Sequence, residues 1–183
     1  MLKFIPQYLG SLRLAVILLL IHVVVSAIIF HFGWVPQLQS LAGGQDILDN
    51  RAGYDAPALY ETLVAYGEEG RNIYSAYLVF IDSPCTLLTG LVFAAFTATI
   101  IGQRKGTWKL LYLLPVWIVL LDIVENIAML WILNTFPQEL PALASVMGQI
   151  TALKMIAVNA SFLLVLIALA LGLIRWLKGR RAN

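Results

Sequence analysis

Long apolar blocks separated by shorter polar stretches set the pattern of this chain. A transmembrane helix needs ~20 mainly apolar residues to cross ~30 Å of hydrocarbon. Four blocks reach this length, and they predict helices over residues 12–32, 74–102, 110–133 and 143–177. The predicted fold class is therefore all-α: a polytopic membrane protein whose four transmembrane helices form a single bundle domain over residues 1–183.

The first apolar block, residues 14–30, follows the basic residues Lys3 and Arg13. A basic start before an apolar run is also typical of a cleaved signal peptide, and residues 25–27 form an acceptable cleavage site. The block is, however, longer than the ~7–15 apolar residues of a signal peptide. We therefore favour a retained first helix over a cleaved peptide.

Residues 33–72 form the most polar stretch, in which acidic residues outnumber basic ones. An Asp-x-Pro sequence at Asp55 is a helix start signal, and Gly70 is a plausible end. Between them, apolar residues such as Leu59 and Leu63 are interleaved with glutamates. This predicts a short amphipathic helix in the first outer loop, lying on the membrane surface. Such a helix would either cap the bundle as a lid or act as a simple interfacial connector.

Composition agrees with the membrane class, because 61% of the residues are hydrophobic and only 12% are charged. A soluble domain has about 25% charged residues. The basic residues are not interleaved with aromatic ones in a patch, so nucleic acid is not an expected partner. The single cysteine, Cys85, excludes an intrachain disulfide. The expected partners are membrane lipids, with a second copy of the chain or another membrane subunit as further candidates.

The distribution of basic residues predicts the orientation, because cytoplasmic loops carry an excess of Lys and Arg. With four crossings, nine of the twelve fall on one side: Lys3, Arg13, Arg104, Lys105, Lys109, Arg175, Lys178, Arg180 and Arg181. The other three are Arg51, Arg71 and Lys154. We therefore expect a multi-pass protein of the inner (plasma) membrane, with both termini cytoplasmic and residues 33–72 outside.

The third apolar block contains polar residues near its middle. Asp122, Glu125 and Asn126 stand at positions i, i+3 and i+4, so a helix places all three on one face. Ionisable groups at membrane depth are costly and normally face a bundle interior or a wet cavity. Any specific activity of the protein is expected to depend on this face.

Two residues of other blocks match this face in depth. Lys154 and Asp82 both fall near the outer ends of their predicted helices. Asp82 is either an interfacial N-cap with Pro84 in the first turn, or an intramembrane residue of a longer helix that Pro84 kinks. The predicted ligand-binding residues of one pocket in the outer half of the bundle are Asp82, Asp122, Glu125, Asn126 and Lys154. Asn159 is placed to join them one turn deeper.

The cluster has a structural and a functional interpretation. A buried Lys154 that pairs with Glu125 or Asp122 would hold two helices together and needs no function. One carboxylate is then surplus, and surplus carboxylates suit proton exchange, metal binding or acid–base catalysis. Asp122 and Glu125 are the candidate catalytic pair. Carboxylates alone would favour hard cations, but no metal motif is present, and we expect no metal and no cofactor.

Several residues carry a resemblance to known proteins: Leu48, Asp49, Tyr54, Gly67, Glu68, Glu69, Gly70, Arg71, Tyr74, Asp82, Pro84, Asp122, Glu125, Asn126 and Lys154. In this pattern the chain resembles a group of uncharacterised four-helix bacterial integral membrane proteins. The resemblance covers most of the chain from residue 48 onward. It implies the architecture and attaches no function.

Three hypotheses of function follow from these features. The first is a small membrane protein that binds a lipid-like or amphiphilic ligand, such as an amphiphilic cation, or serves as a subunit of a membrane complex. The second is a membrane enzyme that acts on a lipid or isoprenoid, with Asp122 and Glu125 as acid–base pair. The third is a proton-coupled transporter, which four helices would support only as an oligomer.

Overall fold

The computed structural model describes residues 9–101 and 106–181, and within these ranges the chain is helical and contains no strand. Four helical stretches are long and apolar enough to cross a membrane, which confirms the predicted all-α class with four candidate spans. The elements, in order, are α2 (Leu12–His31), α3 (Trp34–Leu41), η1 (Leu48–Asn50), α4 (Ala56–Tyr77), η2 (Leu78–Asp82), α5 (Ser83–Ile101), η3 (Gly106–Tyr112), α6 (Leu113–Thr135) and α7 (Pro141–Arg181).

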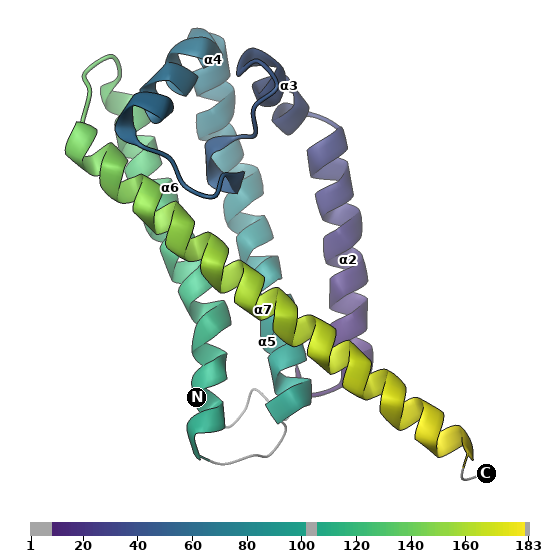
Figure 1. Ribbon diagram of the computed structural model, residues 1–183. Helices are drawn as coiled ribbons and strands as arrows, with labels where there is room; N and C mark the ends of the chain where they lie inside the picture. Colours follow the sequence, from purple (N-terminus) through teal and green to yellow (C-terminus); the bar gives the residue numbers. More distant parts are fainter. Residues whose placement is uncertain (1–8, 102–105, 182–183) are drawn as a thin grey trace.

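The long helix α7 crosses the other helices obliquely (Figure 1). It contacts the first helix, α2, near the end at which α2 begins, where Ala15 packs in one core with Val165 and Ala168. The two helices run in opposite directions and diverge from there, so the later half of α2 stands away from α7 (Figure 1). Ala15 is the one fully buried residue of α2. The helix therefore covers the bundle loosely and leaves space beneath it.

The polar stretch after α3 dips into the bundle instead of running over it. Ile47 and Leu48 are fully buried, and η1 packs against α7. Gly148 of α7 makes this possible, because a Cβ at that position would lie 1.7 Å from the carbonyl oxygen of Tyr54. A helix with any side chain there would push the segment away from the bundle.

Helix α4 has two parts that meet at Gly67. Asp55 is its N-cap, whose side chain accepts a hydrogen bond from the backbone N–H of Ala58 at 2.9 Å. Leu59 and Leu63 are fully buried against α6 and α7. Gly67 has φ +62°, a conformation that glycine adopts without strain, and it turns the helix. The break falls at Gly67 rather than at the predicted Gly70, which packs tightly against Tyr66.

Asp82 lies inside a continuous helical stretch. The helix runs from α4 through the single π-helical turn η2 into α5, without a break at Asp82. Pro84 has no N–H to donate, and the wider turn just before it accommodates this loss. Ser83 supports the turn, since its hydroxyl donates to the carbonyl oxygen of Leu78 at 2.8 Å. Of the two alternatives for Asp82, the structure has the position inside a longer helix and not the helix N-cap.

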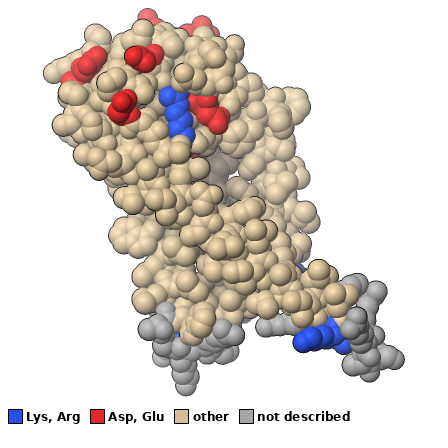
Figure 2. Space-filling view, in the orientation of Figure 1, with Lys and Arg blue, Asp and Glu red and all other residues tan. Residues whose placement is uncertain are grey.

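Charge is divided between the two ends of the molecule. Acidic side chains gather at the end that carries α3 and the start of α4, with a basic side chain among them, and a basic side chain lies near the end of α7 (Figure 2). Of the nine basic residues predicted to share one side, Arg13, Lys109 and Lys178 are described. Lys3, Arg104 and Lys105 lie outside the described residues, as do the side chains of Arg175, Arg180 and Arg181.

Replacing Gly148 by alanine is expected to destabilise the fold, because the new Cβ meets the backbone of Tyr54. Overpacking of this kind costs ~1–3 kcal/mol. Gly172 of the same helix is the matched control, since a Cβ there meets only the flexible end of the Leu12 side chain, at 2.7 Å. Thermal unfolding in detergent should show a lower Tm for Gly148→Ala than for Gly172→Ala. Equal Tm values would contradict the close approach of residues 53–54 to α7.

Candidate functional site

The centre of the polar cluster is Lys154 of α7. Its Nζ atom lies 3.0 Å from Oδ1 of Asp122 and 2.6 Å from Oε2 of Glu125, so one ammonium bridges two carboxylates of α6. All three residues are buried, with Glu125 fully enclosed. As predicted, Asp122, Glu125 and Asn126 share the inner face of their helix. Removing the ammonium would leave two buried carboxylates without a counter-ion, and removing both carboxylates would leave the ammonium without one.

Thr151 completes the surroundings of Glu125. Its hydroxyl donates to Oε1 of Glu125, one helical turn before Lys154 on the same face of α7. Hydrogen bonds to a carboxylate stabilise the charged form. Thr151 therefore stabilises the ion pair between Glu125 and Lys154.

Asn126 links Asp122 to Asp82 on the neighbouring helix. Its amide Nδ2 donates to Oδ2 of Asp82 at 2.8 Å and lies 3.3 Å from Oδ2 of Asp122. The hydroxyl of Ser83 is 3.1 Å from the same nitrogen. The five predicted ligand-binding residues are thus brought together, since Lys154 pairs with Asp122 and Glu125, and Asn126 joins Asp122 to Asp82. Asp82 is the member that has only neutral hydrogen-bond partners among the described residues.

A fourth carboxylate enters the cluster from the segment between α3 and α4. Asp49 of η1 is 3% exposed, and its Oδ2 accepts a hydrogen bond from the Tyr74 hydroxyl at 2.8 Å. Its Oδ1 has no hydrogen-bond partner among the described residues. Burial raises the pKa of the Asp49 carboxyl, and the positive charge of Lys154 partly opposes this shift. The loop therefore inserts a polar group into the bundle at a cost that its one hydrogen bond only partly offsets.

These residues line a cavity of about 320 Å³ between α2 and the rest of the bundle. Asp49, Asp82, Asp122 and Lys154 form its polar end. Its apolar walls come from five helical elements and include Ile29, Phe30, Phe93, Ile118, Val158 and Phe162. Figure 2 shows a recess on this face beside α2. The cavity is the space that remains where α2 and α7 diverge.

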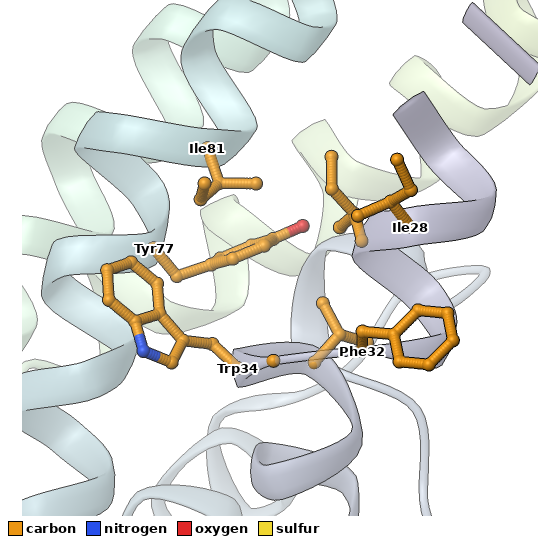
Figure 3. A pocket seen from close by; sticks show the side chains of 8 residues that line it. Ile28, Phe32, Trp34, Tyr77 and Ile81 are labelled. Carbon is orange, nitrogen blue, oxygen red and sulfur yellow. The ribbon is translucent and has the colours of Figure 1, made fainter. Parts of the chain in front are cut away.

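A smaller apolar pocket of about 260 Å³ adjoins the cavity at the end of α2. Ile29 and Tyr77 line both spaces and separate them. In Figure 3 the Tyr77 ring lies between Ile81 and Trp34, and its hydroxyl points toward Ile28. A polar space and an apolar space thus share one wall.

One expectation, that Asn159 joins the cluster, is corrected by this geometry. Asn159 does not join the cluster, because it is exposed and donates to the carbonyl oxygen of Met155. The guanidinium of Arg71 stacks on the Phe136 ring. Among the described residues, no group of three or more His, Cys, Asp or Glu side chains is arranged to hold a metal ion.

Four further cavity residues were missed by sequence reasoning: Asp49, Tyr77, Cys85 and His22. Asp49 looked like one acid among many in a solvated loop, and only its burial distinguishes it. Ile47 and Leu48, the two apolar residues directly before Asp49, are fully buried. That pair was the available signal that the loop turns inward.

Comparisons of the chain with protein-family models, with curated proteins and with solved structures give no match. The assignment of function therefore depends on the geometry of the cluster and the cavity.

Replacing Lys154 by methionine is expected to lower the free energy of unfolding by ~3–5 kcal/mol, because two carboxylates lose their buried counter-ion. Adding Glu125→Gln should recover part of this loss. Full recovery should need Asp122→Asn as well, because Lys154 pairs with both acids. Unfolding in detergent, followed by circular dichroism, measures the series. A single variant Lys154→Met as stable as the wild type would contradict the bridging role.

Proposed function

We propose that this chain is an integral membrane protein that binds an amphiphilic molecule with a cationic head group in the cavity between α2 and α7. The observation that carries the proposal is the excess of carboxylates over cations at the polar end. Asp49, Asp82 and Asp122 line this end, with Glu125 beside them, and the one ammonium there, that of Lys154, pairs with Asp122 and Glu125.

Charge balance explains why a cation suits this site. Lys154 is engaged by Asp122 and Glu125, whereas Asp82 and Asp49 have neutral partners, Asn126 and Tyr74. Buried charges are tolerated when they are paired. A ligand ammonium next to Asp82 and Asp49 supplies the missing counter-charge. Protons on these two acids are the alternative, and they would favour the transport hypothesis.

The shape of the cavity suits the rest of an amphiphile. Its walls are mainly apolar and aromatic side chains, and it opens where α2 covers the bundle loosely. The apolar pocket beyond Ile29 and Tyr77 offers room for part of an alkyl chain. Ligand sites commonly combine such an apolar lining with a few polar groups that set orientation. A molecule could enter sideways from the bilayer without crossing the polar loop.

The proposed orientation places both termini in the cytoplasm and the outer loop, with α3, η1 and the start of α4, on the other side of the inner membrane. The division of charge between the two ends supports it (Figure 2). In this orientation the segment before Gly67 is the proposed amphipathic helix, which covers the outer end of the bundle with Leu59 and Leu63. The carboxylates then lie in the outer half of the bilayer.

Cys85 offers a direct test of the proposed ligand charge, because it lines the cavity and is the chain's single cysteine. In detergent, a cationic methanethiosulfonate reagent should modify Cys85 faster than an anionic reagent of similar size. Dodecyltrimethylammonium should slow the reaction with the small neutral reagent methyl methanethiosulfonate, and dodecyl maltoside should not.

The variant Asp82→Asn should reduce both the charge preference and the protection by dodecyltrimethylammonium. Glu61→Gln is the matched control, since Glu61 lies outside this cavity and should change neither. Equal rates for the two charged reagents, with no protection by the ammonium amphiphile, would contradict the proposal.

The orientation is tested by cysteines introduced into a Cys85→Ser background. A membrane-impermeant maleimide added outside should label Gly44→Cys, which lies in the outer loop at a position with open space around it. It should leave Gly106→Cys, at the opposite end of the bundle, unlabelled until the membrane is permeabilised. Labelling of position 106 alone would invert the proposed topology.

A further inference from the structure

A third hollow, separate from the carboxylate cavity and from the apolar pocket beside it, lies on the surface of the bundle between α4 and the end of α6. It has a volume of about 350 Å³ and a mainly polar lining. We call it the α4–α6 groove, and its lining residues are Glu68, Arg71, Asn72, Ser75, Leu130, Leu133, Asn134 and Phe136. The four residues of α4 recur at helical spacing, so they form one stripe along the helix.

Arg71 is held in a fixed position in this groove. The helix breaks at Gly67, and across this break Nη1 of Arg71 donates to the carbonyl oxygen of Leu63 at 3.0 Å. The guanidinium also stacks on the Phe136 ring, with 4.1 Å between Cζ and the ring centroid. Two contacts on different elements thus orient the group before any ligand arrives, which lowers the entropy cost of binding.

The remaining donors of Arg71 are free to bind an anion. A guanidinium carries five N–H groups, and in the described part of the chain no carboxylate lies within ion-pair distance of Arg71. Glu68 stands three residues earlier on the same stripe, is exposed and lines the same groove. The groove therefore displays one positive and one negative group that do not neutralise each other directly.

An exposed apolar surface continues from the groove toward the middle of the helices. Val79 follows Ser75 by one turn on α4 and η2 and is 45% exposed, and Ile127 of α6 is 62% exposed. Trp131, which is 61% exposed, lies one turn before the end of α6. Exposed tryptophans are typical of the level where the hydrocarbon meets the head groups. The polar groove thus lies at head-group level, directly above a surface suited to alkyl chains.

We propose that the α4–α6 groove binds a zwitterionic phospholipid with a primary amine head group, such as phosphatidylethanolamine. The phosphate lies at Arg71, whose guanidinium geometry matches phosphate oxygens. The amine lies at Glu68, and Asn72, Ser75 and Asn134 supply neutral hydrogen bonds. An alkyl chain follows Val79 and Ile127. One guanidinium and one carboxylate give the groove no net charge, which selects a zwitterion over a lipid with net negative charge.

Native mass spectrometry of the full chain tests this selection. The protein in detergent is titrated with equal amounts of phosphatidylethanolamine and phosphatidylglycerol of identical chains. The wild type should retain phosphatidylethanolamine in preference. Glu68→Gln leaves the groove with a net positive charge and should shift the ratio toward phosphatidylglycerol by about 1.4-fold to fivefold, the range of one exposed ion pair. Glu69→Gln, the neighbouring exposed glutamate outside the groove, is the control and should leave the ratio unchanged.

Arg71→Gln should lower the retention of both lipids, and its circular dichroism spectrum and Tm show whether the loss of the Leu63 contact also affects the fold. Glu68→Gln has no such contact, so its ratio decides the proposal even if Arg71→Gln unfolds. Free phosphoethanolamine should compete only weakly, because it lacks the alkyl chains. An unchanged ratio in Glu68→Gln, or an equal change in Glu69→Gln, would overturn the assignment.

Discussion

The ammonium of Lys154 between Asp122 and Glu125 is the interaction on which the arrangement of this bundle depends. It joins α6 to α7 through two buried ion pairs. Asn126 extends the network to Asp82, and through it to the π-helical turn before α5. Three helical stretches are thus oriented by one connected set of polar side chains. Apolar packing between membrane helices is weakly directional, so such a set has a large part in defining their relative rotation.

The first candidate span, α2, takes no part in this polar network. Its looser packing shapes the cavity. It packs on α5 and meets α7 only near its beginning, so its later half leaves a space lined by the surplus carboxylates. The segment between α3 and α4 closes this space from one end, since η1 carries Asp49 inward next to the close contact of Tyr54 with Gly148. The carboxylates that the fold does not pair with a cation are therefore gathered in this cavity.

The sequence was sufficient to predict the elements with a strong local signal. Block length predicted the four candidate spans, helical spacing placed Asp122, Glu125 and Asn126 on one face, and matched depth associated them with Lys154. What it did not predict depends on three-dimensional contacts. The inward turn of residues 47–50 needs a glycine on a distant helix, and the hydrogen bond from Tyr74 to Asp49 joins residues 25 positions apart. The helix breaks at Gly67, which has φ +62°, whereas Gly70 lies within the helix and close to Leu41 and Tyr66, and the sequence alone does not distinguish the two glycines.

The central claim is that the surplus carboxylates serve a ligand and are not only a structural pairing. The most direct measurement is an experimental density map of the full chain, purified in mild detergent from its native membrane. The account predicts elongated density in the cavity beside α2, with its head group within hydrogen-bond distance of Asp82 or Asp49 and its tail against Phe93 and Phe162. A map in which α2 closes onto α7, with no cavity and with Asp82 bonded to protein groups alone, would contradict it.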